Sequence, residues 1–386
     1  MINVFQPELR ERELAAVAEV FDSNWVGKGS RTAEFEAAFA GHLGVAAERV
    51  MSVNSCTEGL FIAAALSGAG PGDEVVLPTV SFVGAGNAVA SLGATPVFCD
   101  VDPRTLNPTL DDVTAVVTPR TKAMILLHYG GHPGAVAEIA EFCRERGIFL
   151  IEDAACAVAS TVDGRACGVF GDVGVWSFDA MKIVVAGDGG MLTARDPDLV
   201  ARARKLAYFG LEQFSGFSQA KQYDTRWWEF QVSSFSRRSI MNDILSAIGL
   251  VQLDRLAEFV SRRGAITARY DRALADVDGL RLPPPLPAGH SSSHYLYWVQ
   301  MDPAIRDGVA HDLYERGVYT TFRYAALHQV AAYGSRARLP KAERAVAETL
   351  CLPLHQSLSE EDVDQVTAEL RAAIHRRSPD LAGRAR

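Results

Sequence analysis

From about residue 50 to residue 195, short apolar runs alternate with segments of helical length, and this alternation constrains the fold more than any other feature. The apolar runs include RVMSVN, EVVLP, PVFCDV, KAMILLHY and FLIEDAA, and the intervening segments include EGLFIAAAL, FVGAGNAVASL and GAVAEIAEFCRERG. Repeated strand-then-helix order is typical of a mostly parallel sheet with helices on both faces. Functional groups of such sheets gather at the carboxyl ends of the strands. We therefore predict an α/β fold with its chemistry at that edge.

The segments that follow extend the predicted sheet, and the remainder of the chain predicts a second, smaller unit. GDVGVWSFD and GGMLTA indicate two more strands around a glycine-rich turn, and residues 242–276 repeat apolar side chains at helical spacing. Beyond Pro283, a proline-rich linker, the strand-like YLYWVQM and two further helical stretches follow. We predict a large domain over residues 1–250 and a small carboxyl-terminal α/β domain over residues 251–386, with the boundary inside the long helix.

Size, charge and cysteine usage exclude several classes of protein. A chain of 386 residues with 48% hydrophobic content can bury a large core. The formal charge of −9 provides no general basic field, so nucleic-acid binding is disfavoured. No apolar stretch approaches the roughly 20 residues of a membrane helix, and the start lacks the order of a secretion signal, so we expect a cytoplasmic protein without membrane contact. Six dispersed cysteines without CxxC pairs predict reduced, mostly buried thiols, no disulfides and no metal site.

The segment SFDAMK contains the strongest local signal for chemistry. Ser177 ends an apolar strand, and Lys182 follows five positions later, before the glycine-rich VVAGDGGM. An ammonium group is costly to bury among small and apolar residues, so we expect a lowered pKa for Lys182. A partly deprotonated amine can form a Schiff base. This segment alone is equally compatible with a surface lysine in a loop.

The run FLIEDAA supplies a second signal, because it ends in Glu152 and Asp153 at the predicted mouth of the sheet. A pyridoxal ring withdraws electrons effectively only while its ring nitrogen is protonated, and a paired carboxylate holds the proton there. Asp153 precedes Lys182 by 29 residues (182 − 153), which leaves room for one hairpin or crossover. Both side chains can therefore reach one ligand, although a strand-end aspartate is common by itself.

The turn NSCTEGL supplies a third signal. It leads directly into a helix that begins near Glu58, where unpaired backbone N–H groups and the helix dipole favour a phosphate. Thr57 and Ser177 would add hydroxyl groups. The same pattern is also an ordinary helix N-cap, but Lys182 and Asp153 support the phosphate interpretation.

Six segments in this order resemble the nucleotide-sugar aminotransferases of the DegT/StrS type: SCTEGL, PTVSFVGAGNAV, EDAACA, GDVGVWSFDAMK, GDGGML and MNDILSAIGLVQLDRL. The resemblance runs from about Trp25 to Leu370. It implies a fold type I, pyridoxal 5'-phosphate (PLP)-dependent transferase that forms a homodimer with shared active sites. It implies transfer of an amino group, through pyridoxamine 5'-phosphate, from a donor such as L-glutamate to a nucleotide-linked keto sugar, with a dTDP sugar favoured. Such deoxyamino sugars belong to natural products, antibiotics among them, or surface glycans.

The resemblance also implies roles for individual residues. Lys182 would form the internal aldimine, and Asp153 would pair with the pyridine nitrogen, as the residues themselves suggested. Phe82 would lie on the cofactor ring, although without the motif it could equally be a core aromatic residue. The phosphate would be held by Thr57, the backbone of Glu58 and Ser177.

The sequence departs from the family pattern in three places. Arg238 stands where relatives carry an Asn or Lys that reaches across the dimer; it could grip a cofactor or nucleotide phosphate, or be a solvated arginine in a basic loop. Cys156 replaces the more usual His or Gln beside the cofactor and is a poorer hydrogen-bond partner. Where relatives read His-Tyr-x-Pro-x-His, this chain offers three candidates for substrate binding: Arg323, Tyr324 and His328.

Two alternative functions stay open at this point. One is another fold type I enzyme that acts on an amino acid, which would need a dedicated carboxylate-binding arginine in place of a wide nucleotide-sugar cleft. The other is a PLP-binding regulatory or scaffold protein without catalysis. Some relatives carry His in place of the lysine and perform dehydration, and Lys182 argues against that branch.

Overall fold

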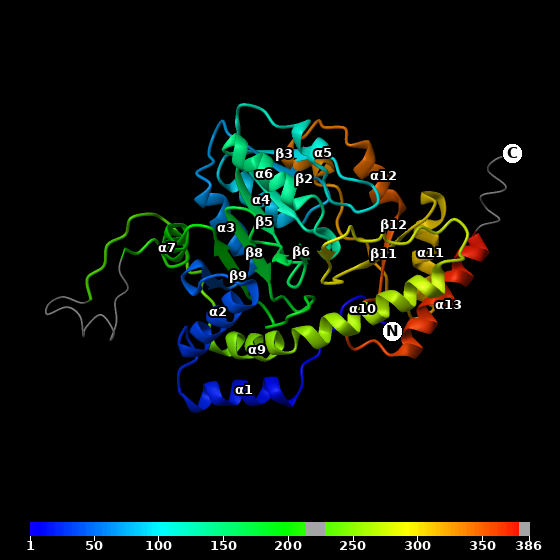
Figure 1. The fold of residues 1–386 in the computed structure, drawn as a ribbon, viewed down its shortest axis with the longest axis horizontal. Helices are drawn as coiled ribbons and strands as arrows, with labels where there is room; N and C mark the ends of the chain where they lie inside the picture. Colours follow the sequence, from blue (N-terminus) through cyan, green and yellow to red (C-terminus); the bar gives the residue numbers. More distant parts are fainter. Residues whose placement is uncertain (213–227, 378–386) are drawn as a thin grey trace.

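The computed structural model describes residues 1–212 and 228–377 and is built around a seven-stranded sheet (Figure 1). The strand order is β1-β9-β8-β5-β4-β2-β3, and every neighbouring pair is parallel except those of β9, which is antiparallel to both β1 and β8. This arrangement confirms the predicted α/β fold with a mostly parallel sheet. The strands are β1 Val50–Val53, β2 Glu74–Pro78, β3 Thr95–Cys99, β4 Thr121–Leu127, β5 Phe149–Asp153, β8 Val173–Ser177 and β9 Gly190–Ala194.

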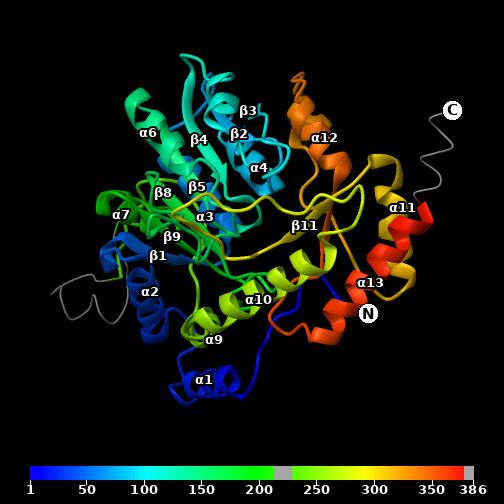
Figure 2. The same cartoon turned by 45° about the vertical axis from the view of Figure 1, so that its right-hand side comes forward.

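Both faces of this sheet are buried, which explains the near-continuous apolar runs in its strands. Successive side chains of a strand point to opposite faces. Val75 and Ile125 accordingly join the core on one face, under α3 (Cys56–Leu66) and α4 (Val83–Ser91). Met124 and Leu126 join a separate core on the other face, under α5 (Leu110–Thr114) and α6 (Val136–Arg146). Figure 2 shows the sheet between these two helical layers.

A third apolar core lies in the carboxyl-terminal part of the chain, around the antiparallel strands β11 (Tyr297–Gln300) and β12 (Thr349–Leu352). It is closed by three helices: α10 (Leu256–Leu274), α11 (Pro303–Glu315) and α13 (Glu360–Arg377). A fourth helix, α12 (Pro340–Glu348), precedes β12, so three helices follow β11 where the sequence predicted two. The domain boundary at residue 250 stays a prediction, and residues 378–386 of the predicted small domain lie outside the described residues.

The long helix predicted over residues 242–276 is divided into α9 (Asp243–Asp254) and α10, which follow one another in nearly the same direction (Figure 1). The division falls at Arg255, whose backbone dihedrals (φ −90°, ψ 0°) leave the helical region. The side chain of Asn242 caps α9 by accepting a hydrogen bond from the Leu245 N–H at 3.0 Å. The remaining elements are α1 Glu11–Asp22, α2 Ser30–Leu43, α7 Pro197–Leu206, a small sheet of β6 Thr161–Val162, β7 Arg165–Ala166 and β10 His290–Ser291, and the 3-10 helices η1 Ala47–Arg49, η2 Tyr129–Gly131, η3 Leu327–Gln329 and η4 Ala331–Tyr333.

Candidate active site

A pocket of about 350 Å³ lies at the carboxyl ends of β5 and β8. The predicted edge of the sheet is therefore where a cavity occurs. The first turn of α3 forms one side of the pocket, and the loop between β8 and β9 forms another. Seven of the residues singled out in the sequence line this pocket: Thr57, Phe82, Asp153, Ser177, Lys182, Arg323 and Tyr324.

Lys182 lies in the loop after β8, where its backbone N–H donates to the Asp179 carbonyl at 2.9 Å. Its Nζ donates a hydrogen bond to the Tyr295 hydroxyl at 3.3 Å and lies 4.6 Å from the centre of that ring. Burial lowers the pKa of Lys182, but the surrounding phenol and thiol groups, those of Tyr295 and Cys156 foremost, raise this pKa well above its usual value. The predicted lowering of the pKa is therefore wrong, because the sequence did not reveal these polar neighbours.

Asp153 ends β5 and is only 2% exposed. One carboxylate oxygen accepts a hydrogen bond from the Ala155 N–H at 3.1 Å, and the other has no donor within the described part of the chain. Burial raises the pKa of Asp153, while the Ala155 N–H and the charge of Lys182 oppose the rise. A buried carboxylate with an unused oxygen on a pocket wall is a ready acceptor for a cationic N–H group.

The turn before α3 forms a helix N-cap, which is one of the two interpretations that the sequence left open. Ser55 is the N-cap, and its hydroxyl accepts a hydrogen bond from the Glu58 N–H at 3.1 Å. The Glu58 side chain turns to Arg237, with an Nε to Oε2 distance of 2.8 Å. The predicted phosphate contact from the Glu58 backbone therefore has a competing partner. The hydroxyl groups of Thr57 and Ser177, together with the first turn of the helix, still face the pocket.

Phe82 immediately precedes α4 and borders the pocket. Its side chain is 39% exposed, so it is not a core aromatic residue. Its ring meets the edge of the Tyr324 ring, with 5.8 Å between the centroids. The two aromatic rings therefore lie side by side at the pocket, where a flat ligand ring could contact them.

Arg323 and Tyr324 form a wall of the pocket that also contains Lys182, whereas Cys156 does not line it. Cys156 is buried, and burial raises the pKa of its thiol to about 11. The thiol is therefore neutral at physiological pH. Arg323 lies over the ring of Phe5 at 4.7 Å and contacts the Met181 sulfur at 2.9 Å. This wall presents one guanidinium and one phenol to the pocket.

Four predicted residues do not line this pocket: Glu58, Cys156, His328 and Arg238. His328 is 5% exposed, and its ring nitrogens contact the Thr79 hydroxyl at 2.7 Å and the Glu343 carboxylate at 3.1 Å. Both nitrogens therefore have protein partners. Arg238 instead lines a second cleft of about 480 Å³, together with Trp25, Lys28 and Arg204 among others.

Sequence reasoning did not single out several residues of the site, among them Tyr295, Asp188 and Ser55. Tyr295, which contacts Lys182, is separated from it by 113 residues, and no local motif marks it. It follows a His-Ser-Ser-Ser segment, in which Ser293 is fully buried. Asp188 and Ser55 line the pocket too. Their positions beside the GDGG and SCTEGL motifs are a signal that could have identified them.

Within residues 1–212 and 228–377, no cluster of three or more His, Cys, Asp or Glu side chains is arranged to hold a metal ion. The six cysteines are unpaired, and Cys56 alone among them is not fully buried. No helix in this part of the chain is long and apolar enough to cross a membrane.

Comparisons with known proteins place this geometry in context. Residues 7–371 match the model of the DegT/DnrJ/EryC1/StrS aminotransferase family. The chain is 59% identical, over 97% of both lengths, to a dTDP-4-dehydro-2,3,6-trideoxy-D-glucose 4-aminotransferase from Saccharopolyspora spinosa. It is similar to the crystal structure of the aminotransferase TlmJ from Streptoalloteichus hindustanus, with a TM-score of 0.93, 64% identity and coverage of 97% of this chain and 99% of that one. It shares its fold with a putative sugar aminotransferase, Spr1654 from Streptococcus pneumoniae, solved in a PLP form (TM-score 0.87, 24% identity, coverage 97% and 98%).

Proposed function

The chain belongs to the DegT/DnrJ/EryC1/StrS aminotransferase family, and we propose that it aminates a nucleotide-linked keto sugar with PLP held at Lys182. One observation carries the proposal. The Lys182 amine and a buried Asp153 carboxylate with an unused oxygen lie on one pocket beside the first turn of α3. A PLP-dependent sugar aminotransferase needs three features together: an amine that binds the cofactor, a carboxylate for the ring nitrogen and a binding site for the cofactor phosphate.

The residues present fit the cofactor. Asp153 would hold the ring nitrogen, Thr57 and Ser177 would hold the phosphate, and Phe82 would cover the ring. When bound, PLP supplies an electron sink that stabilises negative charge at the carbon from which a proton is removed. Cys156 provides a neutral thiol where a stronger hydrogen-bonding group would strengthen the hold, so the ring depends chiefly on Asp153.

Lys182 would act both as the attachment point and as the group that moves the proton. Its raised pKa keeps the amine protonated at neutral pH, so Nζ must give up a proton before it can act as a nucleophile or base. The buried Asp153 would keep its partner N–H protonated during the proton transfer, because a charge-assisted hydrogen bond favours the charged form of both groups. Arg323 and Tyr324 supply polar groups at the wall where a donor carboxylate or a sugar hydroxyl can bind.

The relatives support the proposed substrate, and the family resemblance supports the proposed donor. The 59% identity with a 4-aminotransferase for a dTDP-linked keto sugar supports a dTDP-4-keto sugar as substrate. L-Glutamate is the proposed donor and the cytoplasm the proposed location, as expected for this family. The product would be a deoxyamino sugar for a natural product, such as an antibiotic, or for a surface glycan.

We infer that two copies of the chain assemble around shared active sites. Trp25 is 60% exposed and lines the same cleft as Arg238, and the exposed side chains of Phe82 and Met181 border the Lys182 pocket. Large apolar groups exposed beside clefts are typical of interaction surfaces. Arg238, which lies away from the Lys182 pocket of its own chain, would reach the pocket of the second copy. Light scattering after size-exclusion chromatography checks the dimer.

The test of the proposed function begins with PLP and the purified chain. Borohydride treatment followed by peptide mass mapping should place the reduced adduct on Lys182. A panel of nucleotide-linked 3-keto and 4-keto sugars, each with L-glutamate, should then show amino-sugar formation with at least one dTDP-linked 4-keto sugar. An adduct on another lysine, or none, would overturn the proposal. Turnover of amino acids alone would favour an amino-acid enzyme, and an adduct with no turnover would favour a non-catalytic PLP-binding protein.

A further inference from the structure

Tyr295 contacts the side chain of Lys182, although no sequence motif marked it. Its side chain is completely buried, and its hydroxyl accepts a hydrogen bond from Lys182 Nζ at 3.3 Å. A phenol can accept a hydrogen bond from an ammonium group and can also donate one to a neutral amine. Tyr295 can therefore hold Nζ in the same place before and after the amine loses its proton.

The backbone of Tyr295 is fixed by contacts with other elements. Its N–H donates to the Gly130 carbonyl at 3.2 Å, in the 3-10 helix η2. Its carbonyl accepts a hydrogen bond from the Arg263 guanidinium at 2.9 Å, and Arg263 is itself 2% exposed on α10. These contacts tie the tyrosine to η2, which comes shortly after β4, and to α10, so its hydroxyl has little freedom to move away from Lys182.

The ring of Tyr295 is supported by the amino-terminal arm, defined here as residues 2–8. Phe5 in this arm stacks on Tyr295, with 5.6 Å between ring centroids and 23° between ring planes. Arg323 covers Phe5 at 4.7 Å, and its pKa is raised because the neighbouring phenols of Tyr295 and Tyr324 outweigh its burial. Arg323, Phe5, Tyr295 and Lys182 thus form a continuous series of contacts.

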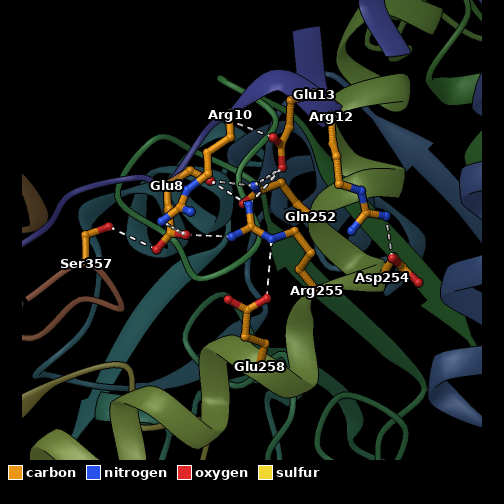
Figure 3. Close-up of polar contacts among 9 residues, drawn as sticks. All are labelled: Glu8, Arg10, Arg12, Glu13, Gln252, Asp254, Arg255, Glu258 and Ser357. Carbon is orange, nitrogen blue, oxygen red and sulfur yellow. Dashed lines mark hydrogen bonds and ion pairs between the residues drawn. The ribbon is translucent and has the colours of Figure 1, made fainter. Parts of the chain in front are cut away.

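The arm is anchored on both sides of Phe5. On one side, the Ile2 carbonyl accepts a hydrogen bond from Tyr319 N–H at 2.9 Å, and the Val4 carbonyl accepts one from Leu354 N–H at 3.2 Å. On the other side, the Glu8 carboxylate is paired with Arg255 at 2.6 Å (Figure 3). Two anchors fix the position of a short segment between them, so Phe5 is held against Tyr295.

We propose that Tyr295 is a positioning residue for Lys182 and that the amino-terminal arm supports it through Phe5. The inference rests on the proposed function, because Tyr295 would hold Nζ in place for the proton transfer that is proposed for Lys182. Its chemical basis, the hydrogen bond between the phenol and the amine, does not depend on the cofactor or the substrate.

The first experiment compares Tyr295→Phe with the matched control Tyr297→Phe. Tyr297 lies two residues further along, and its hydroxyl donates to Asp271 at 2.8 Å, away from Lys182. We expect Tyr295→Phe to lower kcat by about ten- to a hundredfold, the effect of one hydrogen bond to a charged group, with KM changed less than twofold. The control should keep kcat within about twofold, a difference well below one such hydrogen bond.

A second readout needs no cofactor. Reductive methylation of the full chain with formaldehyde and cyanoborohydride, followed by peptide mass mapping, gives the pH at which the Lys182 amine becomes reactive. Because the phenol oxygen accepts a hydrogen bond from the ammonium form, its removal should move this midpoint to lower pH. Tyr297→Phe should leave the midpoint unchanged. A purely structural role for Tyr295 would lower the melting temperature without moving the midpoint.

Phe5→Ala tests the support from the arm. We expect a smaller loss of kcat, about three- to tenfold, because the stacked ring is lost but the hydroxyl remains. Combined with Tyr295→Phe, the same change should have little further effect on kcat, since coupled residues are not additive. Fully additive losses would overturn the role of the arm.

The outcomes separate the inference from the proposed function. An unchanged methylation midpoint and a kcat within twofold of the parent for Tyr295→Phe would overturn the positioning role. Absence of a PLP adduct on Lys182 in the parent chain would instead overturn the proposed function, and the methylation midpoint would still report whether Tyr295 binds the amine.

Discussion

Two groups of buried charged side chains in this molecule are satisfied in different ways. One surrounds Arg255 at the junction of α9 and α10 (Figure 3), where the guanidinium contacts Glu8 at 2.6 Å and Glu13 at 3.2 Å. The other is the pocket, where Lys182 has a phenol as its hydrogen-bond partner and Asp153 has one unused oxygen. The first group pairs each buried charge with an opposite charge, whereas the second leaves bonding capacity for a ligand.

The shifts in pKa reflect the same difference. Around Arg255, the Arg10 N–H and the Gln252 side chain outweigh burial and lower the pKa of Glu13, so its carboxylate is favoured by the fold. In the pocket, burial raises the pKa of Asp153, so its carboxylate is disfavoured by the fold. A site that binds a charged ligand must keep such a group uncompensated, and this costs stability. The ion pairs around Arg255 therefore stabilise the fold, whereas the uncompensated Asp153 carboxylate destabilises it and is available to a ligand.

The largest expected effect comes from Lys182→Ala. Transamination should fall by about four orders of magnitude or more, because attachment and proton transfer are lost together. The chain should still fold, since within residues 1–212 and 228–377 no ion pair joins this lysine to a carboxylate, and its amine is hydrogen-bonded to the Tyr295 hydroxyl. Steady-state rates and thermal melts check both parts, with the exposed Lys122→Ala as control. A rate near that of the parent would remove Lys182 from the mechanism.

Asp153→Asn should lower the rate by about a hundred- to a thousandfold, because a neutral amide stabilises a protonated ring nitrogen poorly. The same substitution should not lower the free energy of unfolding and could raise it. A carboxyl with a raised folded pKa contributes stability below its unfolded value, near 3.8, and loses it as pH rises through the folded value. The Asn variant should therefore be at least as stable as the parent at pH 8 in urea unfolding. A large destabilisation would mean that Asp153 is structural.

Arg255→Met should act on stability more than on rate. Removing the guanidinium leaves the buried Glu13 without a charge partner and leaves Glu8 paired with Arg10 alone, and we expect a loss of about 3 kcal/mol in the free energy of unfolding. The control Arg12→Met breaks an exposed ion pair with Asp254, at 2.6 Å, and should cost less than about 0.5 kcal/mol. Urea unfolding measures both. Equal losses in the free energy of unfolding for the two variants would show that the buried ion pairs of Arg255 stabilise the fold no more than an exposed pair does.

The smallest effect is expected for Glu13→Gln. Because the folded pKa of Glu13 is lowered, its carboxylate contributes stability above the unfolded value near 4.5, and this contribution is lost as pH falls through the folded value. The variant should be less stable by about 1 kcal/mol at pH 7 and should lose less stability than the parent below pH 4.5. Glu11→Gln, exposed on the same helix, is the control. If the free energy of unfolding had the same pH dependence in the variant and the parent, Glu13 would not contribute stability as a carboxylate.

Much of the fold could be read from the sequence, because strands buried on both faces leave continuous apolar runs. The strands β2, β4 and β5 and the helices α4 and α6 lie where the alternation predicted them, whereas the short helix α5 was not predicted. The division of the long helix at Arg255 was not predicted, since the apolar repeat continues across it. The break coincides with the contacts that Arg255 makes to the amino-terminal arm, and these cannot be read from a local pattern.

The same limit applies to the site. The sequence by itself determined that Asp153 ends one strand and that Lys182 follows another, because strand periodicity and parallel order fix which ends share an edge. Only the tertiary structure decided that Tyr295 contacts the Lys182 amine, that His328 is held by Thr79 and Glu343, and that the pKa of Lys182 is raised. Local patterns record each residue's own backbone and burial, whereas a side chain's partners and its pKa depend on groups that folding brings from distant parts of the chain.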